Sequence, residues 1–231
     1  MTRTAIKTIV QPLWVLAMVM FLTACLAMVG CEFAWWAGSN MGLGDEPERK
    51  ATAEYTSLND KVVAVLVSAD DHTLFRHPNV QETICQNVTA TLNQAVDGVS
   101  LVDPIQLATF QRNNPYWVAV PYSDVLRRLS SGGTRVDRLV VIDVARFTTR
   151  DPATAHTWRG VIIANIGVSE AESPTADDHT YSTSVTAMYP TDRPVNLAQA
   201  DEQTIELGLV REFSRRVANL FRDHAVPGEQ Q

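Results

Sequence analysis

The residues whose type and spacing indicate a chemistry are two cysteines near the start of the chain, Cys25 and Cys31. Each directly follows a small residue, Ala24 or Gly30, at the end of an apolar run that starts at residue 9. A basic segment, an apolar segment and a small residue before a cleavage point are the parts of a secretory signal. A Cys directly after that point carries a thiol that can be acylated with membrane lipid. The sequence therefore predicts a lipoprotein signal over residues 1–31.

The two cysteines fit this interpretation in different ways. The segment Leu22-Thr23-Ala24 before Cys25 is the better match by residue type. The apolar run, however, continues past Cys25 and ends only at Cys31, where Glu32 is the first acidic residue of the chain. We expect Cys31 to be acylated, with Cys25 as the alternative.

Two other fates of the N-terminal segment stay open. An uncleaved anchor is one, because about 20 apolar residues can span a bilayer, and a plain secreted protein is the other. Arg3 and Lys7 before the apolar run would leave the N-terminus in the cytoplasm. All three alternatives place the remaining chain on the extracytoplasmic face of the membrane, so the expected location is the bacterial cell envelope.

The rest of the chain carries weaker signals for catalysis or metal binding. Nucleophile elbows (G-x-S-x-G), phosphate loops (GxxxxGKS/T) and GxGxxG fingerprints do not occur in the sequence. His72 and His77 lie five residues apart near Asp70 and Asp71, which is not the helical or hairpin spacing of metal ligands. We expect no catalytic residue, no metal and no cofactor.

The alternative that the residues leave open is a small-ligand binder or hydrolase with a site near Asp143 and His72. Asp143 interrupts an apolar segment between Ile142 and Val144. A carboxylate there either takes part in catalysis or faces solvent, and no partner base can be named for it. The solvent-facing interpretation is the simpler one.

Tyr116 and Trp117 follow Asn114-Pro115 between two predicted helices. Aromatic residues at such a junction usually pack helices onto a sheet. The other interpretation is an exposed contact surface formed by Tyr116 and Trp117. Both stay open from the sequence.

The charge of the chain argues against nucleic acid as a partner. The formal net charge is −7, and it becomes −9 without residues 1–31, because these include two basic residues and no acidic one. An acidic surface repels phosphate backbones. Cys85 is the one cysteine beyond the signal, and beside Ile84 in a helical pattern it is expected to be a small buried hydrophobe.

The pattern of apolar residues predicts one α/β domain over residues 58–224. Strands are expected over 61–67, 99–102, 139–147, 157–169 and 180–189. Helices are expected from Pro78, from Pro104 behind the capping Asp103, from Ser123, and along a C-terminal stripe over 205–221. The predicted domain is three-layer-like, with a mixed sheet that starts with parallel β-α-β connections, finishes with antiparallel strands and carries a long C-terminal helix. Residues 32–57 are predicted to be a flexible tether and residues 225–231 a disordered tail.

Four segments carry a resemblance to known proteins: 58–66, 99–104, 114–117 and 137–143. With them in place, the chain resembles a group of uncharacterised bacterial envelope lipoproteins. Its order of elements is similar to the α/β domain at the amino end of TolB and to the periplasmic part of the curli-secretion lipoprotein CsgG. The β-propeller of TolB and the long pore-forming strand pair of CsgG have no counterpart here, so neither specific activity is carried over.

The resemblance implies a non-catalytic protein-interaction or assembly module of the cell envelope. Its expected partners are membrane lipid, through acylation of the N-terminus, and either an envelope protein or further copies of the same chain.

Overall fold

The computed structural model describes residues 49–226, except 134, 152, 155 and 174–177. Residues Lys50–His224 form one compact unit built on a mixed sheet. The strands of this sheet are β2 (Val62–Ala69), β3 (Ser100–Leu101), β4 (Arg138–Arg150), β5 (Thr157–Glu170), β6 (Tyr181–Tyr189) and β7 (Val195–Asn196). Two further short strands, β1 (Arg49–Ala51) and β8 (His224–Val226), lie at the two ends of the described chain.

The sheet is mixed, with two parallel and three antiparallel strand pairings among the described residues. Its strand order is β3-β2-β4-β5-β6, with β7 also paired to β5. Strand β2 pairs in parallel with β3 and β4, whereas β5 runs antiparallel to β4, β6 and β7. Strand β2 is buried on both faces from Val63 to Val67, as its continuous β-branched sequence predicts.

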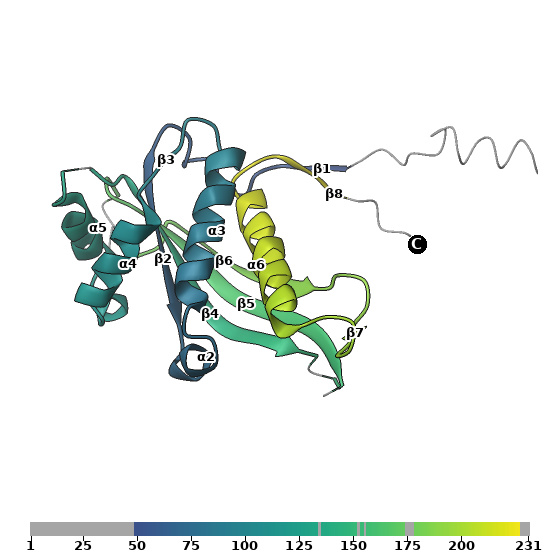
Figure 1. Ribbon diagram of the computed structural model, residues 1–231. Coiled ribbons are helices and arrows are strands. Elements are labelled where there is room, and N and C mark those ends of the chain that lie inside the picture. Colours follow the sequence, from purple (N-terminus) through teal and green to yellow (C-terminus); the bar gives the residue numbers. More distant parts are fainter. Residues whose placement is uncertain (1–48, 134, 152, 155, 174–177, 227–231) are drawn as a thin grey trace, which may run out of the picture. The chain divides into compact units, whose positions relative to one another are not determined.

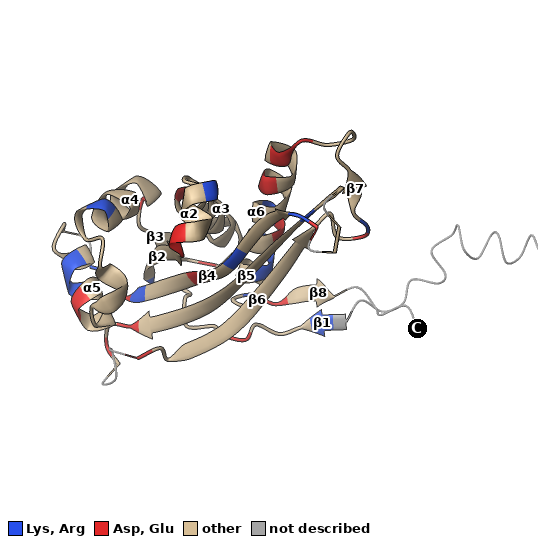
Figure 2. Cartoon of the chain, turned by 90° about the horizontal axis from the view of Figure 1, so that it is seen from below, with Lys and Arg blue, Asp and Glu red and all other residues tan. Residues whose placement is uncertain are grey.

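Six helical segments accompany the sheet (Figure 1): α2 (Asp71–Arg76), α3 (Val80–Ala95), α4 (Pro104–Asn113), the 3-10 turn η1 (Trp117–Ala119), α5 (Tyr122–Ser130) and α6 (Glu202–Asn219). Helices α3 and α6 pack against each other and against the sheet. Figure 2 shows α2, α3 and α6 together on one side of the sheet. Side chains of Asp70, Asp103 and Asp201 cap α2, α4 and α6 by accepting a hydrogen bond from a backbone amide of the first turn.

The predicted mixed sheet and long C-terminal helix are confirmed, and each predicted strand and helix has a counterpart in the structure. The short strands β1, β7 and β8 were not predicted. The prediction missed α2, which lies in a segment interpreted as a polar loop. In α4, Leu107 is fully buried, whereas Ile105 is 67% exposed.

The folded unit begins before residue 58. The Tyr55 ring packs edge-on against Phe221 at 6.1 Å, and its hydroxyl donates to Glu170 at 2.6 Å. The end of the predicted tether is therefore part of the domain. Ala225 and Val226, predicted to belong to the disordered tail, are part of strand β8. The rest of the tether up to residue 48, the signal segment and residues 227–231 lie outside the described residues.

Candidate functional site

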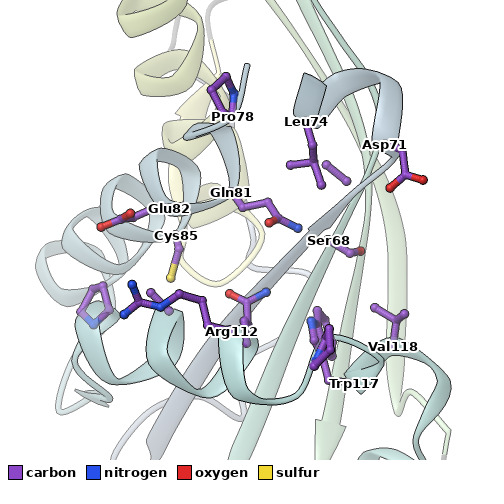
Figure 3. A pocket seen from close by; sticks show the side chains of 15 residues that line it. Ser68, Asp71, Leu74, Pro78, Gln81, Glu82, Cys85, Arg112, Trp117 and Val118 are labelled. Atoms are coloured by element: carbon purple, nitrogen blue, oxygen red, sulfur yellow. The ribbon is translucent and has the colours of Figure 1, made fainter. Parts of the chain in front are cut away.

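The candidate site is a crevice of about 530 Å³ at the carboxyl end of β2, between α3 and α4 (Figure 3). Ser68 and Ala69 of β2 form its floor, and Gln81 and Cys85 of α3 and Trp117 of η1 line its sides. In open α/β sheets, ligands bind outside the carboxyl ends of strands at the point where the strand order reverses. The chain leaves β2 for β3 on one side and returns to β4 on the other side, so this crevice lies at such a point.

The crevice exists because β3 is too short to cover the edge of β2. The first carbonyls on this edge, those of Lys61 and Val63, accept hydrogen bonds from the amides at the start and end of β3. Beyond β3, side chains replace the missing strand. The Cys85 thiol donates to the Val65 carbonyl at 3.3 Å, and the Gln111 amide donates to the Val67 carbonyl at 2.7 Å. The sheet edge is thereby satisfied while space remains between the helices.

Four exposed apolar side chains belong to the segments that form this crevice. Phe75 is 89% exposed, Tyr116 is 80% exposed, and Ile105 and Val118 are 67% and 55% exposed. Val118 lines the crevice, and each of the other three is adjacent in the sequence to a lining residue. We call Phe75, Ile105, Tyr116 and Val118 the apolar rim. Large apolar side chains gathered around a hollow are a feature of binding surfaces.

The polar groups of the crevice are engaged in local structure. Glu82 accepts a hydrogen bond from Gln86 at 3.0 Å, and Arg112 donates to Thr109 at 3.2 Å. Burial raises the pKa of the Cys85 thiol to about 11. At neutral pH this cysteine is a protonated core residue, which confirms its predicted role as a small buried hydrophobe.

The structure separates Tyr116 from Trp117. Trp117 is 4% exposed and lies in the wall of the crevice, so it packs helices as aromatic residues at such junctions usually do. Of the pair, only Tyr116 is accessible to another molecule. The expected surface made of both residues is corrected to one that includes Tyr116, and binding of a partner there stays a prediction.

The two residues of the alternative site, Asp143 and His72, are not brought together in either of the two hollows described here. Asp143 is exposed on β4 and accepts a hydrogen bond from the Ser68 hydroxyl at 2.8 Å. His72 instead lines a second hollow of about 690 Å³, between α2 and the second half of β4. Asp143 lines neither hollow.

The predicted acylation sites Cys25 and Cys31 lie outside the described residues. Within the described part of the chain, no group of three or more His, Cys, Asp and Glu side chains is placed to hold a metal ion. The helices between residues 49 and 226 include none with the length and apolar character that crossing a membrane requires.

Sequence reasoning missed the crevice itself. The apolar pair Leu74-Phe75, inside a segment taken as a polar loop, was the one local sign of a helix there. The contact of that helix with α3 and β2 depends on residues far apart in the sequence, which local patterns do not reveal.

No protein-family model matches the chain, and no curated protein matches it. Among solved structures it is similar to lipoprotein GNA1162 from Neisseria meningitidis, at 13% identity and a TM-score of 0.43, with 69% of this chain and 99% of that chain covered. It is also similar to the PelC dodecamer from Paraburkholderia phytofirmans, at 11% identity and a TM-score of 0.41, covering 75% of this chain and 96% of that chain. The hypothetical protein CT253 from Chlamydia trachomatis gives 15% identity and a TM-score of 0.39, with 69% and 96% covered.

The similar structures thus include a bacterial lipoprotein, at low identity. TM-scores below 0.5 carry no argument about function. The similarity to TolB and CsgG stays a prediction.

Proposed function

We propose that the protein is a membrane-anchored lipoprotein of the bacterial cell envelope that acts as a non-catalytic protein-interaction module. In this proposal the crevice beside β2 receives an apolar segment of an envelope protein partner. The observation that carries the proposal is the apolar rim, in which Phe75 and Tyr116 are almost completely exposed and each directly follows a residue that lines the crevice.

The physical argument concerns the cost of exposing apolar surface to water. Burying apolar area stabilises a complex by roughly 25 cal/mol per Å², and aromatic side chains such as Phe75 and Tyr116 contribute most where they are buried in a partner. Asp71, Glu82 and Arg112 in the lining would contact polar groups of the same segment. The partner expected from this lining is a protein segment with one or two large apolar side chains.

The non-catalytic part of the proposal rests on the state of the reactive groups. The high pKa of Cys85 keeps its thiol protonated and weakly nucleophilic at neutral pH. Asp143 is exposed to solvent and accepts a hydrogen bond from the Ser68 hydroxyl, and this carboxylate lines neither of the two hollows.

Co-purification tests the role of the rim. The full chain is extracted from membranes in a mild detergent, and the amount of bound partner is compared between the natural protein and a Phe75→Glu/Tyr116→Glu variant. The variant Leu207→Glu is the control, because Leu207 is 43% exposed on α6, away from the crevice lining.

We expect a partner protein to co-purify with the natural chain in a stoichiometric amount. The control should retain this amount, and the rim variant should bind at least tenfold less of the partner. If the bound protein is a second copy of the chain, native mass measurement in detergent will show an oligomer that the rim variant dissociates. Recovery of the chain alone, or equal retention by both variants, would contradict the proposal.

The membrane anchor has its own test. Mass spectrometry of the N-terminal peptide from the membrane fraction should give a peptide that starts at Cys31 and carries a diacylglyceryl group. A peptide that starts at Cys25 would select the alternative site, and an intact Met1 would show that the segment is an uncleaved anchor.

A second candidate function is binding of a small molecule, because about 530 Å³ lies in the usual range of small-ligand pockets. The two proposals predict different effects of the rim. Rim substitutions would abolish binding of a protein segment, whereas a ligand held inside the crevice would be lost on filling the crevice with Ala108→Trp and kept in the rim variant.

A further inference from the structure

The second hollow gathers arginine side chains that no acidic residue pairs. Its lining includes Arg76 at the end of α2 and Arg146 and Arg150 of β4. Figure 2 shows basic segments on α2 and on the neighbouring strands. Among the described residues, none forms an ion pair with any of these three arginines.

The strand that carries two of these arginines is irregular at both of them. The pairing of β4 with β5 shifts register between Val144 and Arg146 and again between Thr148 and Arg150. Bulges re-aim side chains and are frequent beside binding sites. The Arg150 guanidinium also lies 3.8 Å from the centre of the Trp158 ring, which limits the conformations of this long side chain.

The two carboxylates in the same lining are partly compensated by helix ends. Asp70 caps α2 and accepts a hydrogen bond from the Thr73 amide at 2.8 Å. Glu202 lies in the first turn of α6 and accepts from the Thr149 hydroxyl at 2.7 Å. The amino end of a helix carries partial positive charge that offsets an acidic side chain there. Within the described residues, Arg76, Arg146 and Arg150 form no ion pair, and Arg150 has only the face of the Trp158 ring beside its guanidinium.

We propose that this hollow binds a phosphate group, with Arg76, Arg146 and Arg150 as the guanidinium donors. A phosphate monoester carries nearly two negative charges at pH 7 and offers three acceptor oxygens, and the planar guanidinium fork matches that geometry. The volume of about 690 Å³ leaves room for more than the phosphate itself, so the ligand is a phosphate ester. The acidic surface of the whole chain makes the interaction local and excludes long phosphate polymers.

Two sources supply this chemistry to an envelope protein, a soluble phosphate ester and a phospholipid headgroup. Calorimetric titration of the full chain in neutral detergent with inorganic pyrophosphate tests the first. Flotation of the protein with vesicles of phosphatidylcholine, with and without phosphatidylglycerol, tests the second. Each assay compares the natural protein with Arg146→Gln and with the control Arg211→Gln, which removes the same charge from an exposed position of α6 outside the hollow.

We expect Arg146→Gln to weaken binding about tenfold or more, because it removes a charge-assisted hydrogen bond, while Arg211→Gln stays within twofold. An effect of the variant on pyrophosphate binding assigns a soluble phosphate compound, and an effect confined to the phosphatidylglycerol vesicles assigns a lipid headgroup. Equal behaviour of the two variants in both assays, or absence of binding by the natural protein in both, would overturn the proposal. The result of these phosphate-binding assays does not depend on whether a partner co-purifies through the apolar rim. The failure of one proposal can therefore be distinguished from the failure of the other.

Discussion

Arg138 is the most deeply buried charged residue of the described chain, and its partners hold the start of β4. Its guanidinium is 3.5 Å from a Glu170 oxygen and 2.7 Å from a Glu172 oxygen, and it donates to the Ser57 carbonyl at 3.2 Å. Its hydrogen bond with Glu172 lowers the pKa of that carboxyl. The cluster joins the segment before β2 to the far end of β5.

Replacing Arg138 by Met is therefore expected to lower the free energy of unfolding by about 3 kcal/mol, because it leaves the partly buried Glu170 without its cation. The control is Arg135→Met, which removes an exposed guanidinium that lies 3.3 Å from the half-buried carboxylate of Asp137. Exposed pairs contribute about 0–1 kcal/mol. Urea denaturation of both variants measures the difference, and equal stability would contradict the importance of the cluster.

His179 is a half-buried imidazole held between β5 and the first residue of α5. Its ring stacks on Tyr122 with centroids 4.5 Å apart, and Nδ1 lies 3.1 Å from the Ser169 hydroxyl oxygen. A Cβ at Gly167 would lie 2.4 Å from this ring, so the strand has room for the imidazole only because residue 167 is glycine. Burial lowers the pKa of His179, against the opposing charge of Asp178.

This shift predicts how stability changes with pH. The unfolded chain protonates His179 as the pH falls through about 6.5, whereas the folded protein resists that proton. The unfolded state then binds more protons, so the free energy of unfolding decreases as the pH is lowered from about 7 to about 5.5. In His179→Gln this part of the pH dependence should disappear. Urea denaturation at several pH values measures the slope, and an unchanged slope would refute the assignment.

At the scale of single residues, sequence predicted what depends on near neighbours. The capping role of Asp103 is confirmed, since its carboxylate accepts from the Ile105 amide at 2.8 Å. Cys85 is buried as predicted. The network of Arg138 was not predicted, because it joins residues up to 115 positions apart, such as Tyr55 and Glu170.

At the scale of elements, the close approach of α6 to β5 is the contact that determines the packing of the long helix. A Cβ at Gly160 would lie 2.7 Å from a Leu209 methyl carbon and 3.3 Å from an Ile205 methyl carbon. The helix can approach the strand this closely only because residue 160 lacks a side chain.

The substitution Gly160→Ala is expected to destabilise the protein by roughly 1–3 kcal/mol, because the added methyl group overpacks this contact. Gly132→Ala is the matched control. The nearest atom to a Cβ there is the Leu129 carbonyl oxygen at 3.9 Å, so the same change should cost less than about 0.5 kcal/mol. Thermal or urea unfolding distinguishes the two, and a tolerated Gly160→Ala would contradict the described packing.

Element type and order were predictable because each strand and each long helix carries its own apolar period. The boundaries differ mainly for β4, which extends to Arg150, three residues beyond the predicted strand. In α4 the apolar residues do not all face the core, because Leu107 is buried and Ile105 is exposed.

At the scale of the whole molecule, the sequence predicted a single α/β domain and a chain that crosses or enters a membrane at its start. It did not predict the two hollows. Each is formed by segments that are distant in the sequence, such as α2 with the second half of β4, and neither contains a recognisable motif. The two hollows therefore arise from residues that form no motif in the sequence, and their arrangement is visible only in the folded chain.

The central claim is that the apolar rim contacts a protein in the envelope. Photo-cross-linking in living cells tests it most directly, with benzoylphenylalanine placed at Tyr116 in one strain and at Leu207 in another. Both positions are exposed, but only Tyr116 belongs to the rim. If the apolar rim contacts a partner protein, position 116 should give one defined cross-linked product of higher mass in the membrane fraction. Position 207 should give no such product. Absence of a product from position 116, or the same products from both positions, would contradict it.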